Sequence, residues 1–147
     1  MSHLNEKGFW DVESLSNVPL VATHSNAHAL CQSARNLTDK QLDAIRATNG
    51  VVGLNYHVGF LREDGKIVRD TSLNEIVRHA LYIADRIGTD HIALGSDFDG
   101  AVMPADLKDT AGLPNLVEAL SAAGFTHDDL QKITHQNWLR ILSDTWN

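Results

Sequence analysis

Residues 72–96, SLNEIVRHALYIADRIGTDHIALGS, contain the clearest predicted helix of the chain and the strand that follows it. Apolar residues recur at helical spacing up to position 87, which is the pattern of an amphipathic helix. Gly88 can end this helix, and residues 91–96 then form a short apolar run. An uninterrupted apolar strand after a helix is typical of a parallel sheet covered on both faces.

The alternation of strand and helix extends along the whole chain. Predicted strands end near His3, His24, Tyr56 and Ser96. The predicted helices cover residues 5–15, 36–48, 72–87, 113–123 and 128–143. This order predicts an α/β fold with a parallel sheet, in which four βα units and the C-terminal helices form half of an eight-unit TIM-like barrel. A four-stranded doubly wound sheet is the alternative.

Composition limits the classes of protein to which the chain can belong. Its 147 residues, 43% of them hydrophobic, are enough for a single domain over residues 1–147. A net charge of -7 without a Lys/Arg cluster argues against nucleic acid as a partner. No apolar run approaches the roughly 18 residues of a membrane-spanning helix, and the polar start does not resemble a signal peptide. We therefore expect a cytoplasmic protein with no membrane span.

Ionisable side chains follow three of the predicted strands. His3 and His24 each end a strand, and Asp97 and Asp99 follow residues 92–96. In barrel enzymes the functional groups gather at the carboxyl ends of the strands. Neighbouring parallel strands lie about 4.8 Å apart, so the two histidines could share one metal. The single cysteine, Cys31, excludes a thiolate-rich zinc site, which leaves imidazole and carboxylate ligands. Hydrogen-bonded structural histidines are the alternative.

Four segments in this order resemble the membrane (renal-type) dipeptidase family. They are Ser2-His3-Leu4, PLVATHSNA at 19–27, ARNLTD at 34–39 and GSDFDG at 95–100. The intervals of 21 residues from His3 to His24 and 11 from His24 to Arg35 also fit. The resemblance covers essentially the whole chain. It implies the C-terminal half of a barrel metallopeptidase whose complete site holds two zinc ions and hydrolyses dipeptides.

The resemblance also assigns roles to individual residues. His3 and His24 match two histidine ligands of one metal, and Arg35 matches the arginine that binds the terminal carboxylate of the substrate. Asp97 matches an aspartate that contacts substrate near the scissile bond, so it is both a catalytic and a substrate-binding candidate. A carboxylate there can relay a proton, and a guanidinium matches a carboxylate in a bidentate way. We interpret Asp99 as part of a turn. His57 lies just past a strand end and could face the site, but we interpret it as a solvated loop residue.

The sequence lacks part of the family pattern. A His-x-Asp motif, a metal-bridging glutamate and a further histidine, which full members carry in the N-terminal half, have no counterpart here. Four strands cannot close a barrel, so we expect two open edges and an uncovered inner face. We therefore expect little or no activity from the chain alone, and association with itself or with an N-terminal half of the barrel. The alternatives are a non-catalytic half-barrel used for interaction or kept as a relic, and another β/α-barrel metal hydrolase of the amidohydrolase type.

Overall fold

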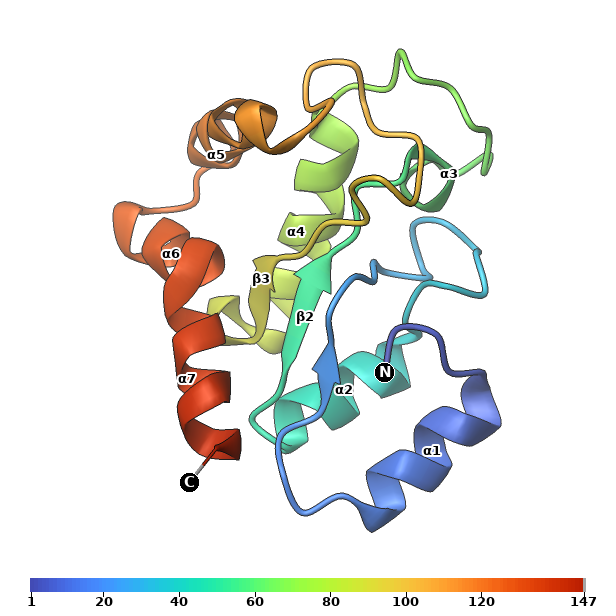
Figure 1. Ribbon diagram of the computed structural model, residues 1–147, viewed down its shortest axis with the longest axis vertical. Helices are drawn as coiled ribbons and strands as arrows, with labels where there is room; N and C mark the ends of the chain where they lie inside the picture. Colours follow the sequence, from blue (N-terminus) through green and yellow to red (C-terminus); the bar gives the residue numbers. More distant parts are fainter. Residues whose placement is uncertain (147) are drawn as a thin grey trace.

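The computed structural model describes residues 1–146 and is built on a small parallel sheet with helices on both faces (Figure 1). Strands β1 (Val21–Ala22), β2 (Val51–Leu54) and β3 (Ile92–Leu94) lie in the order β1-β2-β3. Val21 is paired with Val51, and Val52 with Ile92. The predicted α/β class and parallel sheet are confirmed.

Apart from α3 (Val58–Leu61), which was not predicted, the helices agree well with the predicted ranges. They are α1 (Glu6–Leu15), α2 (Asp39–Ala47), α3 (Val58–Leu61), α4 (Asn74–Ile87), α5 (Leu113–Ala122), α6 (His127–Gln131) and α7 (Asn137–Thr145), with 3-10 turns at Thr89–His91 and Thr110–Gly112. Local chemistry explains several ends. Asn5 accepts a hydrogen bond from the Gly8 amide at the start of α1. Gly88, with φ of 91°, ends α4 in a conformation that favours glycine.

One helix predicted over residues 128–143 is divided into two. A π-helical turn, Lys132–Gln136, joins α6 to α7. The hydroxyl of Thr134 donates to the Leu130 carbonyl at 2.7 Å, and so competes for the acceptor of a regular helical hydrogen bond. The wider turn follows from this competition.

The strand predicted at residues 1–3 is absent, so the described residues contain three strands and not four. These residues form a turn, in which the Leu4 amide donates to the Met1 carbonyl at 3.1 Å. The Met1 amino group donates to the Val21 carbonyl of β1 at 2.8 Å, but the turn that follows prevents these residues from continuing as a strand. His3 therefore reaches the sheet from a turn and not from a strand end.

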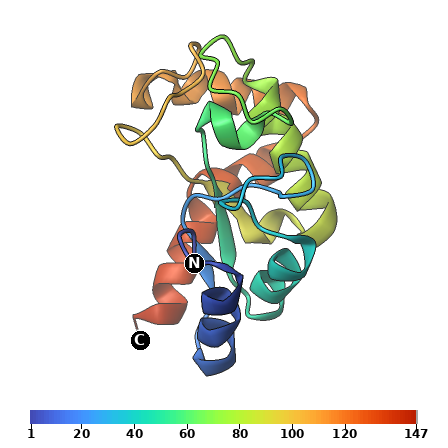
Figure 2. The same ribbon diagram turned by 90° about the vertical axis from the view of Figure 1, so that its right-hand side faces the viewer.

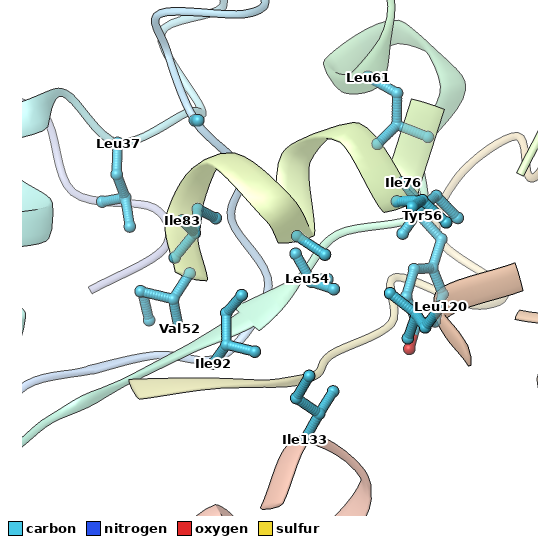
Figure 3. Close-up of a cluster of buried hydrophobic side chains, with 14 of the residues drawn as sticks. Leu37, Val52, Leu54, Tyr56, Leu61, Ile76, Ile83, Ile92, Leu120 and Ile133 are labelled. Atoms are coloured by element: carbon cyan, nitrogen blue, oxygen red, sulfur yellow. The ribbon is translucent and has the colours of Figure 1, made fainter. Parts of the chain in front are cut away.

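The main hydrophobic core lies on the face of the sheet that α2 and α4 cover. Val52, Leu54 and Ile92 point to this side, where they pack with Ile76 and Ile83 of α4 (Figure 3). All five side chains are completely buried. The core continues toward the C-terminal helices through Leu116, Leu120 and Ile133. This face supplies most of the apolar burial that holds the strands in place.

The opposite face is covered in part by α7, which corrects the expectation of an uncovered inner face. Figure 2 shows the sheet between α7 on one side and α2 and α4 on the other. Val51 and Ala93 pack against Ile141, and the half-buried Val21 and Trp138 border this smaller cluster.

Side chains of α7 also occupy the outer edge of β3. The Asn137 amide donates to the Ile92 carbonyl at 2.7 Å and to the Thr89 carbonyl at 2.8 Å. The indole N–H of Trp138 donates to the Leu94 carbonyl at 2.9 Å. The C-terminal helix is thus fixed to the sheet by polar contacts as well as by apolar packing.

Within residues 1–146, none of the helices is both long and apolar enough to cross a membrane.

Candidate functional site

The predicted site residues meet at the carboxyl ends of the three strands, where the arrows of Figure 1 point. His24 follows β1, and Asp97 follows β3. Two glycines allow the backbones to come close there. A Cβ atom on Gly53 would lie 2.2 Å from the Thr23 carbonyl oxygen, and one on Gly95 would lie 2.4 Å from that of Leu54. Any larger residue at either position would push the strand ends apart.

Two imidazoles face each other at this edge. The Nε2 atoms of His3 and His24 are 3.0 Å apart, and the two ring centroids are separated by 5.0 Å. The backbone amide of His24 donates to the Ser2 hydroxyl at 3.0 Å, and its Nδ1 lies 2.7 Å from the Thr23 hydroxyl. These contacts fix the His24 ring so that Nε2 points toward His3.

Burial lowers the pKa of His24 below its ordinary value of 6.5. The nearby charge of Asp97 opposes this shift, whereas Arg35 and His3 add to it. The neutral imidazole is therefore favoured near pH 7, and the neutral ring is the form that binds metals.

Arg35 is held beside the two histidines. Its Nε donates to the Ser2 carbonyl at 3.0 Å, and its Nη2 lies 3.3 Å from Nε2 of His3. The guanidinium also lies over the ring of Phe60, with 5.2 Å from Cζ to the ring centroid. Arg35 is thus a positioned cation at the site and not a free surface charge.

Asp97 is tied to the site by Asn55, a residue that the sequence did not single out. The Asn55 amide donates to Oδ2 of Asp97 at 2.9 Å and to the His24 carbonyl at 3.3 Å. Its Oδ1 accepts from the His57 amide at 2.7 Å. Asn55 is 1% exposed, so one buried side chain connects the three strand ends. A polar residue at the end of an otherwise apolar strand was the available signal.

The backbone of Asp97 adopts the left-handed region, with φ of 86°. Non-glycine residues rarely occupy it, and such strain is often found at functional positions. Asp99 also has a positive φ, 63°, and is exposed in the turn after Asp97. This agrees with its interpretation as a turn residue.

A cavity of about 360 Å³ lies directly beside these groups. Its lining residues are His3, Arg35, His57, Phe60, Asp97, Gly100, Ala101 and Val102. His24 and Asp97 border a neighbouring hollow of about 460 Å³ next to Trp138. A larger hollow, about 520 Å³ near Arg62 and Arg78, lies apart from all four predicted site residues. The interpretation of His57 as a solvated loop residue was wrong, because it is half-buried on the cavity wall.

The donor set fits one side of a metal site. Two imidazole nitrogens that converge at 3.0 Å are suitable ligands for zinc. In the part of the chain that the structure describes, no group of three or more His, Cys, Asp or Glu side chains is arranged to hold a metal ion. Catalytic zinc normally has three protein ligands. His3 and His24 are thus two suitable ligands, one fewer than the usual number for a catalytic zinc site.

A further histidine, His79 on α4, supports the loop between His24 and Arg35. Its Nδ1 accepts from the Ala27 amide at 3.1 Å, and its Nε2 donates to the Leu61 carbonyl at 3.0 Å. It is completely buried, and burial lowers its pKa to about 4. This neutral ring fastens the loop between His24 and Arg35 to α3 and α4. Sequence reasoning assigned His79 no role.

Comparison with known proteins gives a consistent result. All of residues 1–147 match the family described as membrane dipeptidase (Peptidase family M19). An uncharacterized protein in the pqqA 5' region of Klebsiella pneumoniae is 54% identical over 146 residues, which are 99% of this chain and 54% of the relative. Dipeptidase tcpJ of Claviceps purpurea is 33% identical over 147 residues, covering 98% of this chain and 33% of the relative.

A solved structure is equally similar. The metallo peptidase from Rhodobacter sphaeroides, liganded with a phosphinate mimic of the dipeptide L-Ala-D-Ala, superposes with a TM-score of 0.96 at 51% identity. The match covers 99% of this chain and 41% of that chain. The chain thus spans about half the length, or less, of the relatives that it matches.

Proposed function

Because the chain belongs to the membrane dipeptidase family, Peptidase family M19, we propose that it forms part of a zinc-dependent metallopeptidase that hydrolyses dipeptides. The observation that carries the proposal is the convergence of His3, His24, Arg35 and Asp97 at one edge of the sheet. The dipeptidase name of the Claviceps purpurea relative and the dipeptide mimic in the Rhodobacter sphaeroides structure support the substrate class.

His3 and His24 would hold zinc through their Nε2 atoms, in a complete site of two zinc ions. Zinc in such a site supplies Lewis acidity, which polarises a carbonyl and lowers the pKa of water. The chain's own contribution is orientation. The Thr23 hydroxyl holds the His24 ring through Nδ1, and the Ser2 hydroxyl holds the His24 backbone amide, so that Nε2 is left for the metal.

Arg35 would bind the C-terminal carboxylate of the dipeptide. A guanidinium offers parallel N–H donors that match the two oxygens of a carboxylate. The Ser2 carbonyl and the Phe60 ring restrict the guanidinium before substrate arrives. Such restriction fixes the register of the substrate and reduces the entropy lost on binding.

Asp97 would accept and return a proton beside the scissile bond. The Asn55 amide donates to Oδ2 of this carboxylate. Oδ1 makes no hydrogen bond to any of the described residues, so it is open to a proton. A carboxylate fixed through one oxygen and open at the other suits general acid–base work.

The other metal ligands would come from polypeptide outside residues 1–147. We propose that the three strands are part of a (β/α)8 barrel, completed by an N-terminal half or by a second copy of this chain, and that the chain alone has little or no activity. Exposed apolar residues on the flanking helices, such as Leu15 on α1 and Leu139 on α7, suit such association. A cytoplasmic location stays a prediction.

A non-catalytic half-barrel used for interaction is the second candidate. The observation that favours it is that no third metal-ligating side chain joins His3 and His24 among residues 1–146. This candidate binds no stoichiometric zinc, whereas the dipeptidase does.

Elemental analysis of zinc on a light-scattering peak of known mass tests the proposal. We expect about one or two zinc ions per chain in the assembled protein, with loss of zinc in a His3→Ala/His24→Ala double variant. The matched control, His127→Ala on the exposed face of α6, should keep its zinc. Hydrolysis of dipeptides, including those with a C-terminal D-residue, but not of a phosphoester, would support the dipeptidase function. An assembled protein without zinc or turnover would contradict it.

A further inference from the structure

The ring of His57 is fixed by backbone contacts on the cavity wall. The Val102 amide donates to its Nδ1 at 3.1 Å. The Val102 carbonyl is also 3.1 Å from Nδ1, but it already accepts from the Val58 amide at 3.0 Å. Because the Val102 N–H can only donate, whereas the carbonyl already has a partner, we assign Nδ1 as the acceptor and the proton of the neutral ring to Nε2.

Nε2 of His57 is the unused end of this ring. It makes no hydrogen bond to any residue among those the structure describes, and the half-buried side chain lines the cavity that also contains Arg35 and Asp97. A ring held at one nitrogen, with an N–H at the other, is a pre-positioned donor.

Phe60 contacts both His57 and Arg35, which line the same cavity. The His57 ring meets the Phe60 ring edge-on, with 4.6 Å between centroids, and the Arg35 guanidinium lies over the same ring at 5.2 Å. The two donors thus share one aromatic support. Asp97, the carboxylate that borders the cavity, is engaged by Asn55 through one oxygen.

We propose that His57 is a substrate-binding residue that donates a hydrogen bond from Nε2 to the terminal carboxylate held by Arg35. This inference rests on the proposed dipeptidase function and adds a second donor to its carboxylate subsite. Each carboxylate oxygen can accept more than one hydrogen bond, so the His57 donor would add to those of the Arg35 guanidinium.

The test measures carboxylate binding directly, so it needs neither zinc nor turnover. The probes are N-acetylalanine and its neutral amide, titrated into the 147-residue chain with 15N-labelled histidine and arginine and followed by NMR. We expect N-acetylalanine to shift the signals of His57 Nε2 and Arg35 Nε, and the amide to shift neither. Absence of any N-acetylalanine binding would overturn the inference.

Two variants separate direct contact from support of the loop. His57→Asn retains an acceptor for the Val102 amide but lacks the distal donor, and should weaken N-acetylalanine binding by about tenfold, as expected for a hydrogen bond to a charged group. His57→Gln retains a distal N–H and should stay within about threefold of the parent chain, since the donor is preserved. Circular dichroism confirms that both variants fold.

The inference fails if His57→Asn binds the probe as well as the parent, or if His57→Gln is weakened as much as His57→Asn. Carboxylate binding with the expected pattern, in an assembled protein without dipeptidase activity, would support the inference and contradict only the proposed function. Normal turnover with an unchanged KM in assembled His57→Asn would contradict the inference and support the proposed function.

Discussion

His24 at the edge of the sheet and His79 beneath it show two different uses of a partly or fully buried imidazole. Both nitrogens of His79 are hydrogen-bonded to backbone groups of Ala27 and Leu61, and the ring is inaccessible. His24 has one nitrogen held by Thr23, while its Nε2 faces another imidazole 3.0 Å away. Burial lowers the pKa of both rings. A lowered pKa alone therefore does not identify a metal-ligating histidine. The two rings are distinguished by whether the second ring nitrogen already has a backbone partner.

The largest expected effect is on the stability of the His79 region. His79→Leu removes both hydrogen bonds and leaves the buried Ala27 N–H without a partner, while the Leu61 carbonyl keeps only its hydrogen bond from Arg78, so the free energy of unfolding should fall by about 3 kcal/mol. His24→Leu, the matched control at the strand end, should change it by less than about 1 kcal/mol, because that ring is partly solvated. Urea unfolding measures both. Equal losses in the two variants would contradict the comparison.

The second prediction concerns pH. The pKa of His79 is about 4 in the folded chain, against an ordinary value of 6.5. Between these values the unfolded state binds a proton that the folded state does not, so stability is complete above pH 6.5 and falls as the pH drops toward 4. The full loss is roughly 3 kcal/mol. The lowered pKa of His24 acts in the same direction.

Urea unfolding at several pH values between 7 and 4 checks this. A His79→Gln variant, which cannot titrate in this range, should lose most of the slope. The pKa of Asp90 is lowered by the Lys132 ammonium and that of Asp129 by hydrogen bonds from Thr126. The stability that these carboxylates add is lost as the pH falls below about 5, so they affect only the acid end of the measured range. An unchanged slope in His79→Gln would assign the effect to another group.

The third prediction concerns metal affinity. His24→Ala removes one of the two converging nitrogens, so the apparent affinity of the assembled protein for zinc should fall by about 30-fold, or roughly 2 kcal/mol. Competition with a chelating dye measures this. His79→Gln should bind zinc like the parent once corrected for its folded fraction. A zinc affinity that depends on His79 and not on His24 would reverse the roles that the geometry gives them.

Some of these features could be predicted from the sequence and others could not. Helical periodicity and apolar runs locate α4, β2 and β3 because those elements are defined by local pattern. The prediction of a strand at residues 1–3 was wrong. The hydrogen bond from the Leu4 amide to the Met1 carbonyl closes a turn there, and hydrophobic periodicity does not reveal such a contact. The cover of the second face depends on Ile141 meeting Val51 and Ala93, a contact between distant segments.

The same division holds for the site. His3, His24, Arg35 and Asp97 were nominated through motif order, and the structure brings them together. Asn55 and His57 gain their significance from partners far along the chain, Asp97 and Val102. Their roles therefore become visible only when the strand ends meet. The catalytic, metal-binding and substrate-binding assignments themselves stay predictions until they are measured.

The contacts of Asn137 and Trp138 with β3 have a consequence for biosynthesis. These side chains occupy the Ile92 and Leu94 carbonyls on the outer side of the strand, and they are synthesised well after the strand itself. Until then the nascent chain displays a strand whose acceptors are open to any other extended peptide. Chains that terminate before position 137 should therefore aggregate more readily than chains that include α7. Once α7 has been synthesised, it thus protects the edge of β3 from pairing with other chains.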